Sequence, residues 1–251
     1  SRCAGGPETG LAGRQPECVI DEGMSILEGM MPGVAAPTAL IGIAEKGYVS
    51  FSLTVAAEGG HSSTPPAHSA IGILARAIAK LEDHPFPGEL AGPARQMFDA
   101  VGPEMPFGQR AIFANLWLFS PVVERILAAS PETNAVLRTT TAITMIEGGV
   151  KDNVLPQEAK ATANFRILPG ETMESVRKRI CDVIADERVK IDVLGKAQDP
   201  SPVSDIGAPS YKTLERTIRE VTPEAIVGPC LVLGATDSRY FYDITPNVYR
   251  F

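Results

Sequence analysis

Hydrophobic and polar side chains alternate most clearly in residues 48–55, where Val, Phe, Leu and Thr predominate. This pattern predicts a strand. Apolar residues then recur at helical spacing in residues 67–81, which predicts a helix. Between the two, residues 59–63 (GGHSS) predict a sharp turn, because glycine tolerates bends that other residues resist. We therefore expect His61 at the end of a strand, beside a turn that leads into a helix.

The same kinds of pattern recur in the second half of the chain. Strands are predicted over residues 140–147, 159–168 and 189–194. A helix is predicted over residues 172–186, with Thr172 as its N-cap. Together with the first strand and helix, the order is strand, helix, strand, strand, helix, strand. That order is typical of a ferredoxin-like, split β-α-β fold.

A long proline-containing segment, residues 83–138, interrupts this unit. It is predicted to hold two or three short helices, one of them over residues 122–129, and its aromatic side chains are expected in packing surfaces. Residues 24–37 are predicted to be a loop. Outside the unit, strands are predicted over residues 18–21, 38–44 and 230–233, and a helix over 209–221.

The predicted fold class is therefore α/β, with a discontinuous organisation. A ferredoxin-like domain over residues 46–198 is expected to be inserted in an α/β domain supplied by residues 1–45 and 199–251. Residues 1–17 are Gly-rich without periodicity, and are predicted to be a frayed terminus. Residues 1–45 are too few to complete the α/β half, since a doubly wound sheet needs several βα units.

Composition and charge limit the classes of molecule that this chain is expected to bind. The net charge of the 251-residue chain is −7, its pI is about 5.1, and no run of Lys or Arg occurs. This argues against nucleic acid, whose binding depends on neutralising phosphates. No apolar stretch reaches the roughly 18 residues that a membrane helix needs, and the first residues lack the apolar core of a signal peptide. No membrane partner is expected, and a cytoplasmic location is the default expectation.

The four cysteines are widely spaced, and none forms a Cys-x-x-Cys pair. A cysteine zinc site is therefore not expected. Cys181 and Cys230 are predicted to be core thiols. The count does not demand disulfides, so a reducing compartment is the default expectation.

Several polar residues stand at predicted strand ends and turns, and each has a structural as well as a functional interpretation. His61 could be a surface turn histidine, and Asn153 a turn residue. Arg166 could be an exposed strand charge, although its planar guanidinium suits a carboxylate. Asp21 follows a short apolar run and could be a turn carboxylate.

Taken together, four stretches resemble the M20 family of dizinc peptidases and amidohydrolases. The closest likeness is to its carboxypeptidase S and N-acyl-amino-acid hydrolase branch. The stretches are VIDEG at residues 19–23, GGHSSTPP at 59–66, GGVKDNVLPQEAKATANFRILPG at 148–170 and GATDSR at 234–239. The third is specific, whereas each short motif alone would be weak. The resemblance covers nearly all of the chain from about Cys18 onward.

The resemblance implies a metallopeptidase or aminoacylase that uses two zinc ions. Its substrates would be N-acyl amino acids or small peptides, cleaved at the amide bond next to a free carboxylate. It also implies that the ferredoxin-like domain is a lid that makes a homodimer.

The resemblance further assigns roles to single residues. Asp21 matches an acidic ligand of one zinc. His61 matches a lid histidine that reaches the site of the other protomer and hydrogen-bonds the tetrahedral intermediate. The remaining matches are to residues that hold or line the substrate: Asn153, Arg166, Gly234, Thr236 and Ser238.

The chain departs from the family pattern in its metal ligands and general base. Its three histidines, His61, His68 and His84, all fall within or beside the predicted lid, and no Glu-Glu pair occurs. We therefore expect a fragment that lacks the N-terminal catalytic half and the C-terminal end of such an enzyme, binds zinc weakly or not at all, and is inactive alone. The alternative is a non-catalytic ferredoxin-like dimerisation module.

Overall fold

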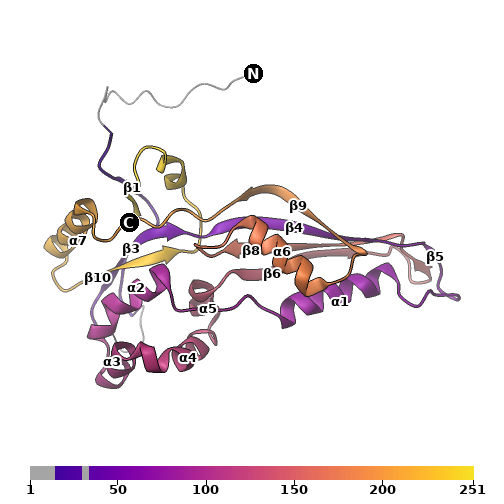
Figure 1. The fold of residues 1–251 in the computed structure, drawn as a ribbon, viewed down its shortest axis with the longest axis horizontal. Coiled ribbons are helices and arrows are strands. Elements are labelled where there is room, and N and C mark those ends of the chain that lie inside the picture. Colours follow the sequence, from indigo (N-terminus) through magenta and orange to yellow (C-terminus); the bar gives the residue numbers. More distant parts are fainter. Residues whose placement is uncertain (1–14, 30–33) are drawn as a thin grey trace.

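The computed structural model describes residues 15–29 and 34–251. Most of the predicted frayed terminus, and Cys3 with it, lies outside the described residues. Two sheets lie end to end along the long axis of the molecule, and a small two-stranded sheet stands at one end (Figure 1).

The four-stranded sheet has the strand order β6-β8-β4-β9, and every neighbouring pair is antiparallel. Along the chain its elements follow in the order β4, α1, β6, β8, α6, β9, which confirms the predicted ferredoxin-like order. The bounds are β4 (Gly47–Ala56), α1 (Ala70–Asp83), β6 (Thr140–Gly148), β8 (Glu158–Ile167), α6 (Met173–Ile184) and β9 (Val189–Gln198).

Capping side chains determine where the two helices begin. Thr172 accepts a hydrogen bond from the Ser175 N–H and forms a capping box, so its predicted role is confirmed. Ser69 accepts from the Gly72 N–H, and α1 therefore starts at Ala70, three residues later than predicted.

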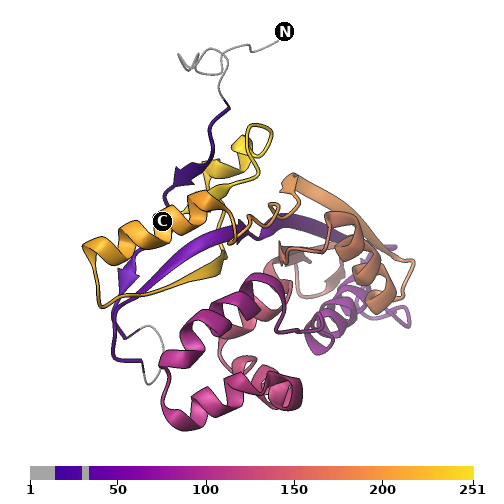
Figure 2. The same ribbon diagram turned by 60° about the vertical axis from the view of Figure 1, so that its left-hand side comes forward.

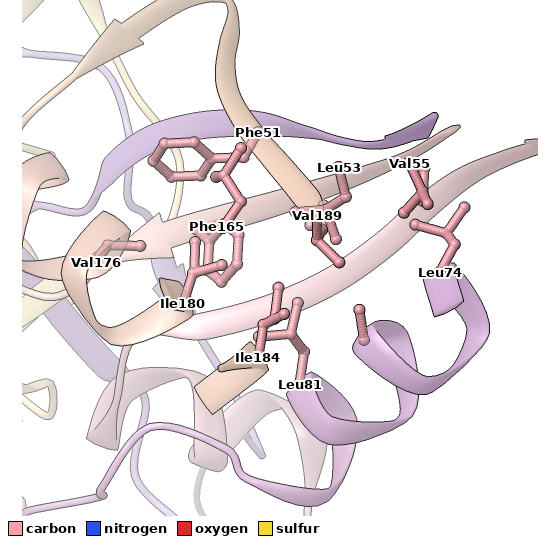
Figure 3. Packing of buried hydrophobic residues seen from close by; sticks show 14 of the residues in the cluster. Phe51, Leu53, Val55, Leu74, Leu81, Phe165, Val176, Ile180, Ile184 and Val189 are labelled. Carbon is pink, nitrogen blue, oxygen red and sulfur yellow. The ribbon is translucent and has the colours of Figure 1, made fainter. Parts of the chain in front are cut away.

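Both helices cover one face of this sheet and enclose an apolar core (Figure 3). The ring of Phe165 lies edge-on to those of Phe51 and Phe86, with centroids 5.8 and 6.0 Å away. The prediction of a core thiol at Cys181 is wrong, because this residue is exposed. The buried side chains of α6 are Val176, Ile180 and Ile184, and Cys181 follows Ile180 by about 100° around the helix.

The five-stranded sheet combines strands from both ends of the described chain. β1 pairs in parallel with β11, β11 pairs antiparallel with β3, and β3 pairs in parallel with β10. A short β2 also pairs with β3, in a segment predicted to be loop. The bounds are β1 (Val19–Asp21), β2 (Ile26–Leu27), β3 (Thr38–Glu45), β10 (Ile226–Val232) and β11 (Val248–Arg250).

Helices cover both faces of this second sheet (Figure 2). α7 (Pro209–Val221) has the predicted bounds and packs Tyr211 and Ile218 against the side of β3 that carries Ile41 and Ile43. Leu40 points to the opposite face, as side-chain alternation along a strand requires, and packs against the interrupting segment.

Residues 83–138 hold four α-helices, where two or three were predicted: α2 (Gly92–Val101), α3 (Phe107–Ala114), α4 (Leu116–Leu127) and α5 (Pro131–Leu137). Their buried side chains, such as Met97 and Phe98, share a core with Leu40 and Cys230 of the five-stranded sheet. These helices therefore pack on the five-stranded sheet, although they are inserted between elements of the four-stranded one. The domain boundaries at 46 and 198 remain a prediction.

The chain passes between the two sheets at residues 45–47, 86–89, 137–139 and 199–201, which we call the waist. Lys46 is buried there and its Nζ donates to the carbonyls of Ala135 and Arg138, at 2.8 and 2.7 Å. Arg138 Nη1 donates to the carbonyl of Phe86 at 3.0 Å, and the Ser201 N–H donates to the carbonyl of Glu45 at 3.1 Å. All four passages are thus tied to one another. Burial lowers the pKa of Lys46 to about 8.

Candidate active site

Asp21 ends β1, and backbone donors hold both oxygens of its carboxylate. Oδ2 accepts from the N–H of Ser238 at 2.8 Å, and Oδ1 accepts from the N–H of Glu22 at 2.9 Å. The side chain is partly exposed. A carboxylate oxygen can accept more than one hydrogen bond or ligand, so each oxygen keeps acceptor capacity. The Asp21 carboxylate is therefore held in a fixed orientation, and its oxygens remain accessible for binding a ligand.

The loop that follows β10 carries the three predicted substrate-lining residues. Thr236 caps the short helix η2 (Asp237–Phe241), and Ser238 is fully buried. A Cβ atom added at Gly234 would meet no atom within 4 Å, so the space beside it is open. The structure thus brings Thr236 and Ser238 together with Asp21, from the other end of the described chain.

A buried ion pair that sequence reasoning missed lies directly behind this loop. The Glu45 carboxylate and the Arg250 guanidinium are both 0% exposed, and Nε lies 3.1 Å from Oε1. The same Oε1 accepts from the N–H and Oγ1 of Thr236, at 2.9 and 2.5 Å, and from Oγ of Ser238 at 3.3 Å. Arg250 Nη1 donates to the hydroxyl of Tyr242 at 3.1 Å.

One sequence signal for this pair exists, but it is weak. The apolar run of β3 ends in an acid, Glu45, at a position where the strand is still buried. Its partner Arg250 is 205 residues further along the chain, and no periodicity connects residues at that separation.

His61 lies at the far end of the molecule, in the two-stranded sheet of β5 (Gly60–His61) and β7 (Val154–Leu155) (Figure 1). Its exposed ring accepts the N–H of Ser63 at Nδ1, over 3.2 Å. Because a backbone N–H only donates, Nδ1 is an acceptor. In the neutral ring the proton is therefore on Nε2, which becomes a hydrogen-bond donor.

Asn153 stands beside His61. The N–H of Ser62 donates to the Asn153 carbonyl at 3.1 Å, and Val154 of β7 pairs with His61 of β5. The side-chain Oδ1 of Asn153 is buried and has no hydrogen-bond partner among the described residues. The structure therefore places His61 and Asn153 together, away from Asp21.

Arg166 occupies a third location. It lies on β8 between Tyr48 and Thr140, and its guanidinium carbon is 4.9 Å from the centroid of the Tyr48 ring. Ala159, at the end of β8 that lies next to β7, is seven residues away, which is roughly 23 Å along a strand. One copy of the chain therefore does not bring His61, Arg166 and Asp21 into one site.

Asp21 has the chemistry of a zinc ligand and could supply one oxygen. Within residues 15–29 and 34–251, no three His, Cys, Asp or Glu side chains are grouped so that they could hold a metal ion. Zinc sites use three or four protein ligands, of which Asp21 would be one. The same residues include no helix with the length and hydrophobicity to cross a membrane.

The fold and these motifs agree with one class of protein. Residues 43–192 match the model of the peptidase dimerisation domain, and the chain belongs to the M20 peptidase family. An M20 metallo-carboxypeptidase from Sulfolobus solfataricus, 17% identical, superposes with a TM-score of 0.58 over 94% of this chain and 63% of its own. At that identity the likeness concerns the fold alone.

Two curated relatives are more similar in sequence. The N-fatty-acyl-amino acid synthase/hydrolase PM20D1 of Xenopus tropicalis is 45% identical over 93% of this chain and 46% of its own length. The probable carboxypeptidase S-like 2 of Dictyostelium discoideum is 42% identical over 94% of this chain and 45% of its own. The chain thus spans about half the length of these relatives.

Proposed function

We propose that this chain is part of a zinc-dependent hydrolase that cleaves the amide bond of N-acyl amino acids or small peptides next to a free carboxylate. The names of its relatives support this substrate class. The observation that carries the proposal is the hydrogen bond from Ser238 to Asp21, which joins two family motifs 217 residues apart. In the proposal, Asp21 is one oxygen ligand of a zinc ion. Bound zinc would polarise the scissile carbonyl and activate water.

His61 acts in this proposal from a second copy of the chain. Its Nε2–H would donate to the oxygen of the scissile carbonyl as negative charge develops there. The separation of the β5–β7 sheet from Asp21, at opposite ends of one copy, supports action in trans (Figure 1). Asn153, beside His61, would hold the same carbonyl from the same copy.

Arg166 is proposed to bind the free carboxylate of the substrate. A guanidinium presents two parallel N–H donors to a carboxylate, and stacking on Tyr48 restrains its orientation. Gly234, Thr236 and Ser238 would line the cleft beside Asp21, where the open space next to Gly234 leaves room for substrate.

The proposed homodimer forms through the edge strand β6. Among the described residues this strand has a neighbour on one side only, and Met145 and Ile146 are exposed on it. Ile71 of α1, which lies beside Gly148 at the end of β6, is exposed as well. Pairing with a second copy would cover this edge and these side chains.

Complementation between two inactive variants tests the proposal in a longer protein that contains this chain. Asp21→Asn should lose zinc and activity, whereas His61→Ala should lose about 10²–10³ in kcat and keep its zinc. In randomly mixed dimers of the two variants, about one quarter of the wild-type activity should return, because half of the dimers hold one intact site of two. No recovery on mixing would contradict action in trans, and zinc loss in His61→Ala would contradict its role as a donor.

The second candidate is a non-catalytic dimerisation module, favoured by the match over residues 43–192 and by the lack of a metal-binding cluster among the described residues. Both candidates predict that the 251-residue chain alone dimerises and hydrolyses nothing. Light scattering measures the first property and an N-acyl amino acid hydrolysis assay with added zinc measures the second. Only the hydrolase proposal predicts activity in the longer protein.

A further inference from the structure

We propose that Glu45 and Arg250 are positioning residues for this site. Together they hold the loop of residues 234–238, and through the N–H of Ser238 they orient the Asp21 carboxylate. The significance of the pair for catalysis rests on the proposed function above, while the positioning itself concerns the chain alone.

A continuous set of hydrogen bonds connects the pair with Asp21. Glu45 Oε1 accepts from two groups of Thr236 and from Oγ of Ser238. Thr236 Oγ1 also lies 2.7 Å from Ser238 Oγ and accepts from the Ser238 N–H at 3.3 Å. That N–H also donates to Asp21 Oδ2 at 2.8 Å. Glu45 thus holds Thr236 and the side chain of Ser238, and Ser238 is the residue whose N–H donates to Asp21.

Arg250 lies between the strand that carries Asp21 and the strand that carries Glu45. On β11 it stands opposite Asp21 of β1 and opposite Gly42 of β3. A Cβ atom at position 42 would lie 2.5 Å from a Val232 methyl group and 3.1 Å from the Arg250 Cβ. Glycine at this position therefore leaves the space along which Arg250 reaches Glu45.

A neutral acceptor in place of Glu45 would accept from the same donors and would cost less free energy to remove from water. Stability alone is therefore a weak explanation for the buried ion pair. What the carboxylate adds is its charge, which makes the hydrogen bonds from Thr236, Ser238 and Arg250 stronger than those to a neutral amide oxygen. Its guanidinium partner compensates the buried charge. This arrangement suits a group whose task is to hold a loop in one conformation.

Amide hydrogen exchange in the 251-residue chain, followed by NMR, tests the inference without metal or substrate. Two paired variants provide a matched comparison. Glu45→Leu with Arg250→Met removes both charges and the acceptor, whereas Glu45→Gln with Arg250→Met removes the charges and keeps an acceptor. The amides of Leu40 and Gly228, which pair in register on β3 and β10, report on the sheet itself.

The first variant should exchange the Ser238 amide about ten-fold faster or more, relative to the two control amides. The second should remain much closer to the wild type. Equal protection of Ser238 in both variants, at the wild-type level, would overturn the inference. If all amides lose protection in parallel, the pair only stabilises the sheet, and the inference is again wrong.

If the first paired variant does not fold, Ser238→Ala replaces it, because alanine removes the hydroxyl that donates to Glu45 and leaves the backbone N–H that donates to Asp21. Faster exchange of the amide at position 238 alone would support the inference, and unchanged exchange would overturn it. Zinc binding and hydrolysis by the wild-type longer protein are measured separately. Their absence would contradict the proposed function without altering the exchange result.

Discussion

The two sheets of this chain bury different kinds of side chain. The core between the four-stranded sheet and its helices is apolar, from Val49 to Ile191, and the polar side chains that the sheet buries, Ser50, Ser52 and Thr162, are uncharged. The five-stranded sheet buries the Glu45–Arg250 ion pair and the hydroxyl of Ser204 along with its apolar residues. Buried charge is costly unless it is paired, so it persists mainly where it has a further task. We call the four-stranded region with its two helices the scaffold, because apolar packing holds it together, whereas the five-stranded region also buries a charged pair beside Asp21.

The largest expected effect concerns the apolar core of the scaffold. Phe165→Ala removes a ring that packs against both Phe51 and Phe86, and should lower the free energy of unfolding by about 4 kcal/mol. Urea denaturation measures this loss. Val193→Ala on the exposed side of β9 is the control and should change stability by less than about 0.5 kcal/mol. A similar loss in both variants would contradict the assignment of the core.

The next effect concerns the buried charge of the five-stranded sheet. Arg250→Met alone leaves the Glu45 carboxylate buried and unpaired, which should cost about 3 kcal/mol. Adding Glu45→Gln should recover most of that loss, because the remaining side chain is neutral. Thermal and urea unfolding of the single and paired variants check both statements. The comparison between the sheets fails if Arg250→Met unfolds like the wild type.

A smaller effect returns to the scaffold. Thr172→Ala removes the side-chain acceptor that caps α6 at the Ser175 N–H, and should cost about 1 kcal/mol. Thr213→Ala, at an exposed position within α7, is the matched control. Alanine favours a helix interior, so this variant should be neutral or slightly more stable. Differential scanning calorimetry distinguishes the two, and equal melting temperatures would disprove the capping role.

The smallest effect concerns the waist. Burial lowers the pKa of Lys46 to about 8 from 10.5, so between these values the unfolded chain binds more protons than the folded one. The free energy of unfolding should therefore rise with pH, by about 0.7 kcal/mol from pH 7.5 to 8.5, and fall again as pH drops through 8.

Lys46→Met should remove this rise, which urea titrations at the two pH values can measure. The two pH values are kept below 9 because burial raises the pKa of Cys230 to about 12 in the folded chain. Near pH 9 and above, the thiol loses its proton more readily in the unfolded chain, which favours the unfolded state. A pH profile that is unchanged in Lys46→Met would rule out Lys46 as its source.

The scaffold could be predicted from sequence to a large extent, because its pairings follow one another along the chain. Alternation indicated the strands and helical spacing the two helices, and only one arrangement of six elements in that order is common. Boundaries shifted where a cap decides them, as at Ser69. Cys181 was misplaced because the residue beside a buried position in a helix already faces outward.

The five-stranded region was less predictable, since its contacts join distant segments. Periodicity shows that one side of α2 is apolar, but not which sheet that side will meet. The family motifs indicated Asp21, Thr236 and Ser238, which the structure brings together. They did not indicate Glu45 and Arg250, because a single charge beside an apolar strand has many possible partners and the sequence names none.

The waist has a mechanical consequence. A joint of two parallel strands can bend about the line between them, whereas the chain passes between the sheets four times here. Lys46, Arg138 and Ser201 bond these passages to one another in a single cross-section. Any rotation of one sheet against the other must therefore strain several passages together, or carry helices α2–α5 along as part of the moving body. The insertion therefore adds two further connections between the sheets, and these connections restrict the directions in which one sheet can rotate against the other.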